Sequence, residues 1–475
     1  MATVALRASR AWPLCMTLVA AAAMPLPAPG QVLTDVQQAP TLTIERYPED
    51  WSNLAVKANR TGRWTEPFKY IPWATDGSTY LTTGAELRIR YEGYKNANWG
   101  AAPDDHYTWY RFLPYADLHV GSARVFVQPI VSAIRGTGRA RTPVDTTATD
   151  ILQAFAEVEF EVAGGATARV SVGRKLVSLG AGRFIDTRYG PNIPQAFDGT
   201  DVTLADDGGQ LRAFYLRPVD TRGGAFDDTT SHQRSVWGIY GTRWVGRERN
   251  TGLDVFFLGF RDTHALFDQG AGRELAHTVG ARLFGDTGTQ YWNLEGVLQR
   301  GSFAGKRVAA GGIGGELGHR FMQARLQPIV ALTADYISGD ADPGDKRLGT
   351  FNPMFPRGKY FAAQSPVGPR NLIHAQPSIT VHPAEAVAVS MTGVAYWRAS
   401  TRDGLYNIPG ALVRSGQASD ARFIGTQLEL AVAWQATAEL NLSTSMSAFF
   451  PGRFIRETGP SRTMRVAAAM ANFRF

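Results

Sequence analysis

The sequence predicts an all-β fold, a transmembrane antiparallel β-barrel of about 18 strands set in an outer membrane. Two patterns predict it: many segments alternate apolar and polar side chains, and long and short connections between these segments follow one another along the chain. Composition agrees, because only 19% of the 475 residues are charged while glycine occurs 50 times. That balance is typical of a large β protein with many turns.

The first 30 residues have the features of a secretion signal. Arg7 and Arg10 precede an apolar stretch, and small residues before Gln31 suit a cleavage site. The stretch is short for a membrane-spanning helix and is followed by prolines, so we expect cleavage and not an anchor. The chain therefore divides into a signal peptide at 1–30, an N-terminal periplasmic segment at 31–80 and a barrel at 81–475.

Strand alternation is clearest between Leu81 and Tyr94. Apolar residues such as Leu87 and Ile89 fall on one face, and every charged residue falls on the other, because successive side chains of a strand point to opposite faces. The expected strands are 81–94, 110–121, 123–135, 151–162, 166–177, 198–205, 209–218, 234–246, 252–261, 274–284, 289–301, 306–318, 321–337, 371–382, 386–399, 419–433, 438–449 and 463–475.

The connections between these strands alternate in length. Long ones such as 136–150 and 338–370 lie between short ones such as 163–165 and 383–385, and only 302–306 is short where a long one is due. Bacterial barrels combine long extracellular loops with short periplasmic turns and keep both termini in the periplasm. A soluble β protein has no reason to alternate in this way.

Aromatic residues near strand ends predict girdles at the two lipid–water interfaces. The last strand ends at Phe475 with apolar residues at alternate positions before it, which looks like the signal that barrel-assembly machinery reads. We therefore expect outer-membrane lipid and that machinery as partners. The expected girdle residues are Trp109 and Tyr110 at one rim, and Tyr291, Trp292 and Trp434 at the other.

Short motifs in three stretches resemble the alginate-export family of outer-membrane porins. They are Lys69–Pro72 and Gly84–Glu92 in the first, Gly173–Lys175, Gly180–Arg183, Arg188, Gly190–Asn192 and Phe197–Gly199 in the second, and Asn352–Gly358 in the third. The resemblance runs from about Trp51 to the C-terminus. It implies a monomeric barrel with an arginine-lined constriction, in the outer membrane of a Gram-negative bacterium. The family's named member exports alginate, an acidic polysaccharide, but the family indicates the fold better than the cargo.

Inward-facing charges are the candidate selectivity residues of such a pore. Guanidinium groups stay charged and bind carboxylates in bidentate fashion, so a group of them attracts uronate anions. The alternatives are that these charges fill and stiffen the barrel wall, or brace the loop 178–197 through Asp186 or Asp198. Alternation points Glu86, Arg88, Arg90 and Arg111 inward, and the resemblance adds Arg174, Arg183, Arg188, Asn192 and Asp198.

Other chemistry has weaker support. Lys and Arg number 49 against 42 Asp and Glu, without a basic block, so nucleic acid is not expected as a partner. The sequence holds no Gly-x-Ser-x-Gly motif, and its histidines have no metal-ligand spacing, so we expect neither an enzyme nor a cofactor. The carboxylates of Asp340, Asp342 and Asp345 can bind Ca²⁺, although an acidic surface turn is the simpler interpretation.

Two function classes stay open, with a barrel enzyme or adhesin as a third. The first is passive export of an acidic polysaccharide such as alginate, delivered by periplasmic export components. The alternative is a general or substrate-specific uptake porin for small anions. The turn from Trp434 to Thr437 is too short to form a lid, so any plug must come from the extracellular loops or from the segment 31–80.

Overall fold

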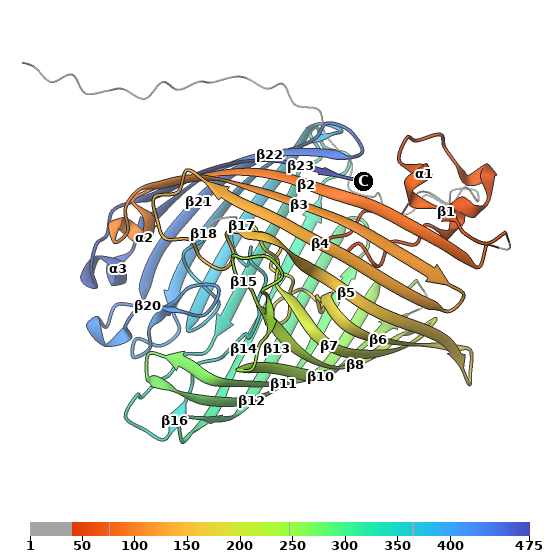
Figure 1. Cartoon of the computed structure of the whole chain (residues 1–475). Helices are drawn as coiled ribbons and strands as arrows, with labels where there is room; N and C mark the ends of the chain where they lie inside the picture. Colours follow the sequence, from red (N-terminus) through yellow and green to blue (C-terminus); the bar gives the residue numbers. More distant parts are fainter. Residues whose placement is uncertain (1–39, 76, 247, 363–364) are drawn as a thin grey trace, which may run out of the picture.

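The computed structural model describes residues 40–475 except positions 76, 247, 363 and 364. In that part of the chain, 18 long antiparallel strands form one closed barrel (Figure 1). They are β2 (Thr79–Lys95), β3 (Asp105–Val120), β4 (Ala123–Arg135), β5 (Thr147–Val162), β6 (Ala166–Leu176), β7 (Ala196–Asp206), β8 (Gly209–Asp220), β10 (Arg234–Val245), β11 (Thr251–Phe267), β12 (Gly270–Asp286), β13 (Gln290–Phe303), β14 (Lys306–Arg320), β15 (Ile329–Ile337), β17 (Leu372–Ala384), β18 (Val387–Arg398), β21 (Phe423–Gln435), β22 (Leu440–Pro451) and β23 (Met464–Arg474).

The barrel closes because β2 pairs with β3 on one side and with the last strand, β23, on the other. Closure leaves no strand edge unpaired, which is what a sheet in a lipid bilayer requires. None of the helices in the described residues is long and apolar enough to cross a membrane. The short elements are β1 (Ile71–Pro72), β9 (Thr229–Thr230), β16 (Arg347–Leu348), β19 (Leu405–Tyr406), β20 (Leu412–Arg414), η1 (Ser52–Ala55), η2 (Lys57–Asn59), η3 (Gly416–Ala418), α1 (Glu66–Lys69), α2 (Ala97–Gly100) and α3 (Arg453–Glu457).

The predicted strand number is confirmed, but several predicted boundaries are wrong. The predicted strand 321–337 begins only at Ile329, because the Phe321 N–H donates to the carbonyl of Pro328 and closes a turn. The predicted long connection 262–273 is a tight hairpin, since β11 continues to Phe267 and β12 begins at Gly270. Strands β11 and β12 therefore extend beyond their predicted ends, past an irregularity in the register between Asp262 and Ala265.

Apolar side chains face outward, and polar side chains face the lumen. On β2, Leu87 and Ile89 are 48% and 42% exposed, whereas Glu86 and Arg88 are buried. This distribution suits a wall with lipid outside. Tyr110 also faces outward, but Trp109 is wrong as a girdle residue: it is buried in the lumen, where its indole N–H donates to Asp145.

The two ends of the barrel differ. Short connections, such as 121–122 and 163–165, lie at the same end as both chain termini of the barrel, and we call this the short-turn end. The connections 136–146, 177–195 and 338–371 lie at the opposite, long-loop end. Figure 1 shows α1 and β1 beside the short-turn end, near the C-terminus. The predicted signal peptide and its cleavage site lie outside the described residues.

Candidate functional site: the barrel lumen

All but one of the predicted inward charges of β2 and β3 form ion pairs within these two strands. Glu86, Arg88 and Arg111 are each at most 3% exposed, so their predicted inward direction is confirmed. Arg111 forms an ion pair of 2.6 Å with Glu86, and Arg90 forms one of 2.5 Å with Glu92. Arg88 has no carboxylate partner in the described residues and donates to main-chain carbonyls instead.

These carbonyls belong to the connection 177–195, which enters the lumen. Arg88 donates to the carbonyls of Tyr189 at 2.9 Å and Pro191 at 2.6 Å, and Arg111 donates to that of Pro191 at 3.2 Å. The fully buried side-chain amide of Asn192 donates to three carbonyls, those of Tyr110, Ala133 and Asp145. The inward arginines of β2 and β3 therefore hold the main chain of a lumen loop.

The three arginines of the family-like stretch do not converge on one point. Arg174 pairs with Asp198 at 2.8 Å, on the face of β6 opposite to the lumen-facing Lys175. Arg183 reaches Asp335 at 2.5 Å, and Arg188 donates to the carbonyl of Pro356 at 3.1 Å. Each guanidinium thus has its own partners, as expected under the alternative in which these arginines brace the lumen loop. Their part in selectivity stays a prediction.

A second connection fills the lumen beside the first. Phe355 pairs with Ile185 through an isolated β-bridge that joins the two connections. Both residues pack into an apolar cluster with the inward side chains Phe214 and Phe260. Part of the material that plugs the lumen thus comes from connections at the long-loop end, which is one of the two predicted sources of a plug.

The N-terminal segment is the other source. The Tyr47 ring packs against lumen-facing Phe126 and Phe155 at 6.2 and 5.3 Å, and its hydroxyl donates to the carbonyl of Leu176. Arg46 donates to the carbonyl of the last residue, Phe475, at 2.7 Å. Part of the segment expected in the periplasm therefore occupies the lumen near the short-turn end.

The space left by these insertions follows the wall from β17 to β23. A cavity of about 330 Å³ has Arg90, Lys359 and Glu429 as its charged lining. A cavity of about 270 Å³ follows at the short-turn end, with Arg63, Lys69, Arg474 and Glu439 as its charged lining. On each of β21, β22 and β23, a residue that lines the first cavity lies two positions from a residue that lines the second. The two cavities therefore follow one another along the same wall. We call the two together the β23 passage.

Lys359 stands out among the charged residues of this passage. It is exposed, and it has no hydrogen-bond or ion-pair partner in the described part of the chain. Desolvation in the lumen and the charge of Arg90 lower the pKa of Lys359, whereas the carboxylate of Glu429 raises it. An anion between Arg90 and Lys359 would stabilise both cations. The sequence analysis missed Lys359, although it directly follows the family-like stretch Asn352–Gly358.

A third cavity, of about 330 Å³, lies across the lumen, and its charged lining has four basic side chains against three acidic ones. Its Arg282 pairs with Asp254 at 2.5 Å, and its Arg212 pairs with Asp201 at 3.2 Å. Lys175 lies 3.4 Å from Asp201 as well. Its cations thus already have carboxylate partners, unlike Lys359 in the β23 passage.

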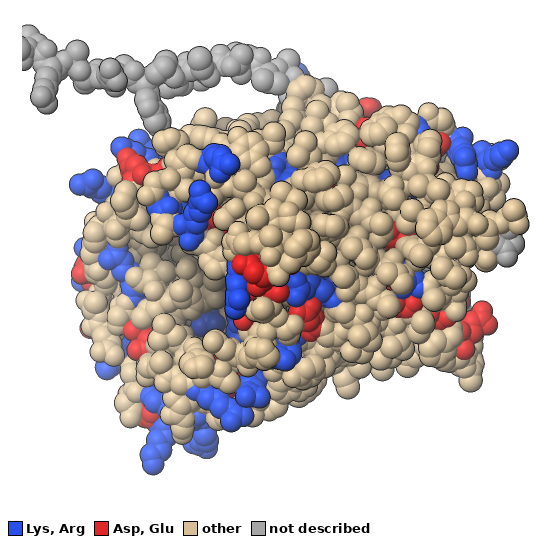
Figure 2. Space-filling view, in the orientation of Figure 1, with Lys and Arg blue, Asp and Glu red and all other residues tan. Residues whose placement is uncertain are grey.

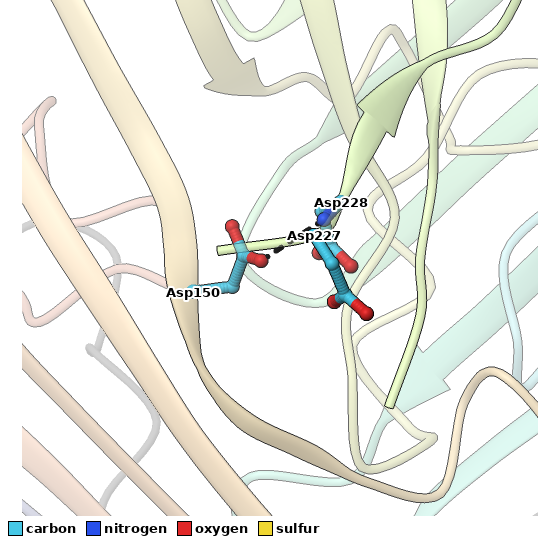
Figure 3. Close-up of side chains that lie close together, drawn as sticks. All are labelled: Asp150, Asp227 and Asp228. Carbon is cyan, nitrogen blue, oxygen red and sulfur yellow. Dashed lines mark hydrogen bonds between the residues drawn. The ribbon is translucent and has the colours of Figure 1, made fainter. Parts of the chain in front are cut away.

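Acidic residues gather at one place near the long-loop end. Asp150 of β5 lies beside Asp227 and Asp228 (Figure 3). Arg174 lies 3.8 Å from Asp150 and offsets part of this charge. The predicted calcium candidate does not form: Asp340, Asp342 and Asp345 do not meet among the described residues, and each accepts a main-chain N–H of its own turn, from Gly349, Gly344 and Arg347 respectively.

Solved structures of outer-membrane porins share this fold. The chain matches OccK2 (OpdF) of Pseudomonas aeruginosa, solved in complex with glucuronate, with a TM-score of 0.57 at 12% identity, over 83% of this chain and 98% of that one. It matches a BenF-like porin of Pseudomonas fluorescens with the same four values. It matches OpdK of Pseudomonas aeruginosa, solved with vanillate, with a TM-score of 0.54 at 11% identity, over 83% and 98% of the two chains.

At such identities the likeness concerns the fold alone. No curated protein matches the chain in sequence. The model of the family described as "Alginate export" matches residues 79–469, which is nearly the whole barrel. With the closed barrel, its apolar outer wall and its charged lumen, this match places the protein in the Gram-negative outer membrane as a pore. The chain belongs to the alginate-export family.

Proposed function

We propose that the protein passes carboxylate-bearing solutes by diffusion along the β23 passage, and that its cargo is an acidic polysaccharide of the alginate type leaving the cell. The unpaired Lys359 beside Arg90 carries the proposal. One chain encloses the whole passage, because β2 pairs with β23, so we propose that a monomer conducts.

The charge of the passage supports an anionic cargo. The cavity lined by Lys359 has two basic side chains against one acidic side chain, and the cavity at the short-turn end has three basic side chains against one acidic side chain. In a narrow space with a low effective dielectric constant, an excess of cations attracts anions more strongly than it does in bulk water. Most of the other residues that line the cavity beside Lys359 are small, although Phe361 and Met470 also line it, so a sugar ring meets few bulky obstacles. Examples of the small residues are Ser390, Ala431, Ser443, Ser445 and Ala468.

Family membership supports a polymer as the cargo. A polyuronate carries one carboxylate on each sugar, and the passage places cations at two levels, at Lys359 and at Arg63 with Arg474. Successive carboxylates can therefore be passed from one level to the next. We propose that periplasmic export components deliver the polymer to the short-turn end.

Uptake of small anions is the second candidate, and one observation favours it. The insertions from both ends divide the lumen into cavities of a few hundred Å³, which is the size of a sugar acid and not of a long chain segment. A monomeric uronate fits this space without any movement of the loops.

Current block in a planar bilayer separates the two candidates. Oligomannuronates of increasing length, added on the short-turn side, should give blocks that lengthen with chain length if the passage holds a polymer. Glucuronate alone should give only brief events. Under the uptake candidate, glucuronate should bind from the long-loop side and longer oligomers should give no events. If neither anion interacts with the open pore, both candidates are wrong.

A further inference from the structure

A group of basic side chains lies on the outer wall of the barrel at the long-loop ends of β11 to β14. All its members are exposed. Figure 2 shows Lys and Arg side chains gathered at the lower left, where Figure 1 places β11, β12 and β16. The members are Arg261, Arg273, Arg300, Arg307 and Arg347, which we call the arginine patch.

The patch faces away from the lumen. Phe260, Ala276 and Val308 are buried on the inner side of these strands, at most 3% exposed. Arg261 and Arg307 directly neighbour Phe260 and Val308, so alternation points them outward. The cargo passage therefore does not use these arginines.

The patch begins where the apolar outer band ends. Val279 and Leu298 face each other in the register and are 51% and 59% exposed. The next outward pair toward the long-loop end is His277 and Arg300. The Trp237 ring lies against His277 with 6.1 Å between centroids, and tryptophans gather at membrane interfaces. The patch thus lies at the level of lipid headgroups.

The arginines of the patch lack carboxylate partners. At the short-turn rim, Arg243 pairs with Asp206 and Arg320 with Asp286. No patch arginine is in an ion pair within the described residues, and Asp345 accepts the main-chain N–H of Arg347. The register also sets Arg307 beside Arg347. Like charges side by side are unfavourable unless an anion lies between them.

We propose that the arginine patch binds the phosphate groups of a phosphorylated glycolipid in the outer leaflet. Guanidinium groups bind phosphate in bidentate fashion, and long loops mark the extracellular end of bacterial barrels. Phosphates on a lipid lie at the depth where the apolar band ends. The inference is independent of the cargo, because the patch lies on the outer face of β11 to β14, whereas the passage lies inside the barrel along β17 to β23.

Binding of lipid A to the full-length protein in detergent tests the proposal. Diphosphoryl lipid A should bind to the parent protein at least about tenfold more tightly than dephosphorylated lipid A, because only the former offers phosphate groups to the guanidinium groups. The variant R261Q/R273Q/R300Q/R307Q should lose this preference. The matched control R141Q/R222Q/R402Q/R456Q removes four exposed arginines from the long-loop connections and should keep it.

Faster migration of unheated samples on gels reports whether each variant has folded. If the fourfold patch variant fails to fold, R307Q/R347Q tests the same surface and should weaken binding several-fold. An equal affinity of the parent protein for the two lipids would overturn the proposal. So would equal affinities of the folded patch variant and the loop control for diphosphoryl lipid A. Binding of uronate oligomers at the patch without binding of lipid A would overturn it as well.

Discussion

Arg111 of β3 and Glu86 of β2 form an ion pair of 2.6 Å inside the lumen, and neither side chain is more than 3% exposed. The Tyr189 hydroxyl donates to the same carboxylate, and Arg111 also donates to the carbonyls of Pro191 and Asn192. This ion pair on the wall is thus one of the anchors of the lumen loop 177–195. Breaking this ion pair should therefore loosen the loop.

Replacing Arg111 by Met should release the loop. Glu86 would stay buried without its main partner, and breaking a buried ion pair costs about 3–5 kcal/mol. The barrel should still form, because its ladders do not depend on the loop. Single-channel conductance should rise and fluctuate more. R222Q, in an exposed connection, is the control and should behave as the parent. An R111M pore with the parent's steady conductance would show that the loop is held by other contacts.

The variant R174A/R183A/R188A tests the family-like arginines. Removing the three guanidiniums leaves Asp198, Asp335 and Glu295 without their cations, so the pore should become more negative and its anion preference should fall several-fold. Gels of heated and unheated samples check assembly, and reversal potentials give the selectivity. R222A is the control. A folded triple variant with the parent's selectivity would exclude these residues from ion selection.

The N-terminal segment should be released by the variant W64A/F68A. The rings of Trp64 and Phe68 lie 5.3 and 5.9 Å from that of Phe475, and they hold the segment against the last strand. Limited proteolysis should then cut the segment faster, and conductance should increase as Tyr47 leaves the lumen. W73A is the matched control, since Trp73 is 65% exposed and has no ring partner among the described residues. Equal proteolysis of the two variants would contradict this role.

The connection 221–228 should loosen as pH rises. Burial, and then the charge of Asp150, raise the pKa of Asp228 to about 6. A carboxyl with a raised pKa in the folded state contributes stability below its unfolded value near 3.8, and this contribution is lost as pH rises through about 6. A spin label at Gly223→Cys should therefore be more mobile at pH 7.5 than at pH 5. D228N should remove the pH dependence, and an unchanged pH response in D228N would rule out Asp228 as its source.

The barrel could be predicted from sequence because alternation is a local property. Each charged residue from Glu86 to Glu92 shares its face with residues two positions away, whatever the rest of the chain does. The path of the connections could not be predicted. Phe355 meets Ile185 far along the chain, and contacts of this kind between the two connections accompany the placement of Lys359 in the cavity that Arg90 also lines. Trp109 is a different case: it lies two residues from inward-facing Arg111, so alternation alone places it in the lumen, and only its contact with Asp145, in a connection, could not be predicted.

Charge reversal at Lys359 tests the central claim most directly. The reversal potential of the K359E pore in a planar bilayer under a salt gradient is compared with those of the parent and of K346E, which changes an exposed lysine of the same connection outside the passage. The parent and K346E should prefer anions, and this preference should fade as salt shortens the Debye length from about 8 Å. K359E should lose the preference or reverse it. A cation-selective parent, or a K359E pore as anion-selective as K346E, would contradict the account.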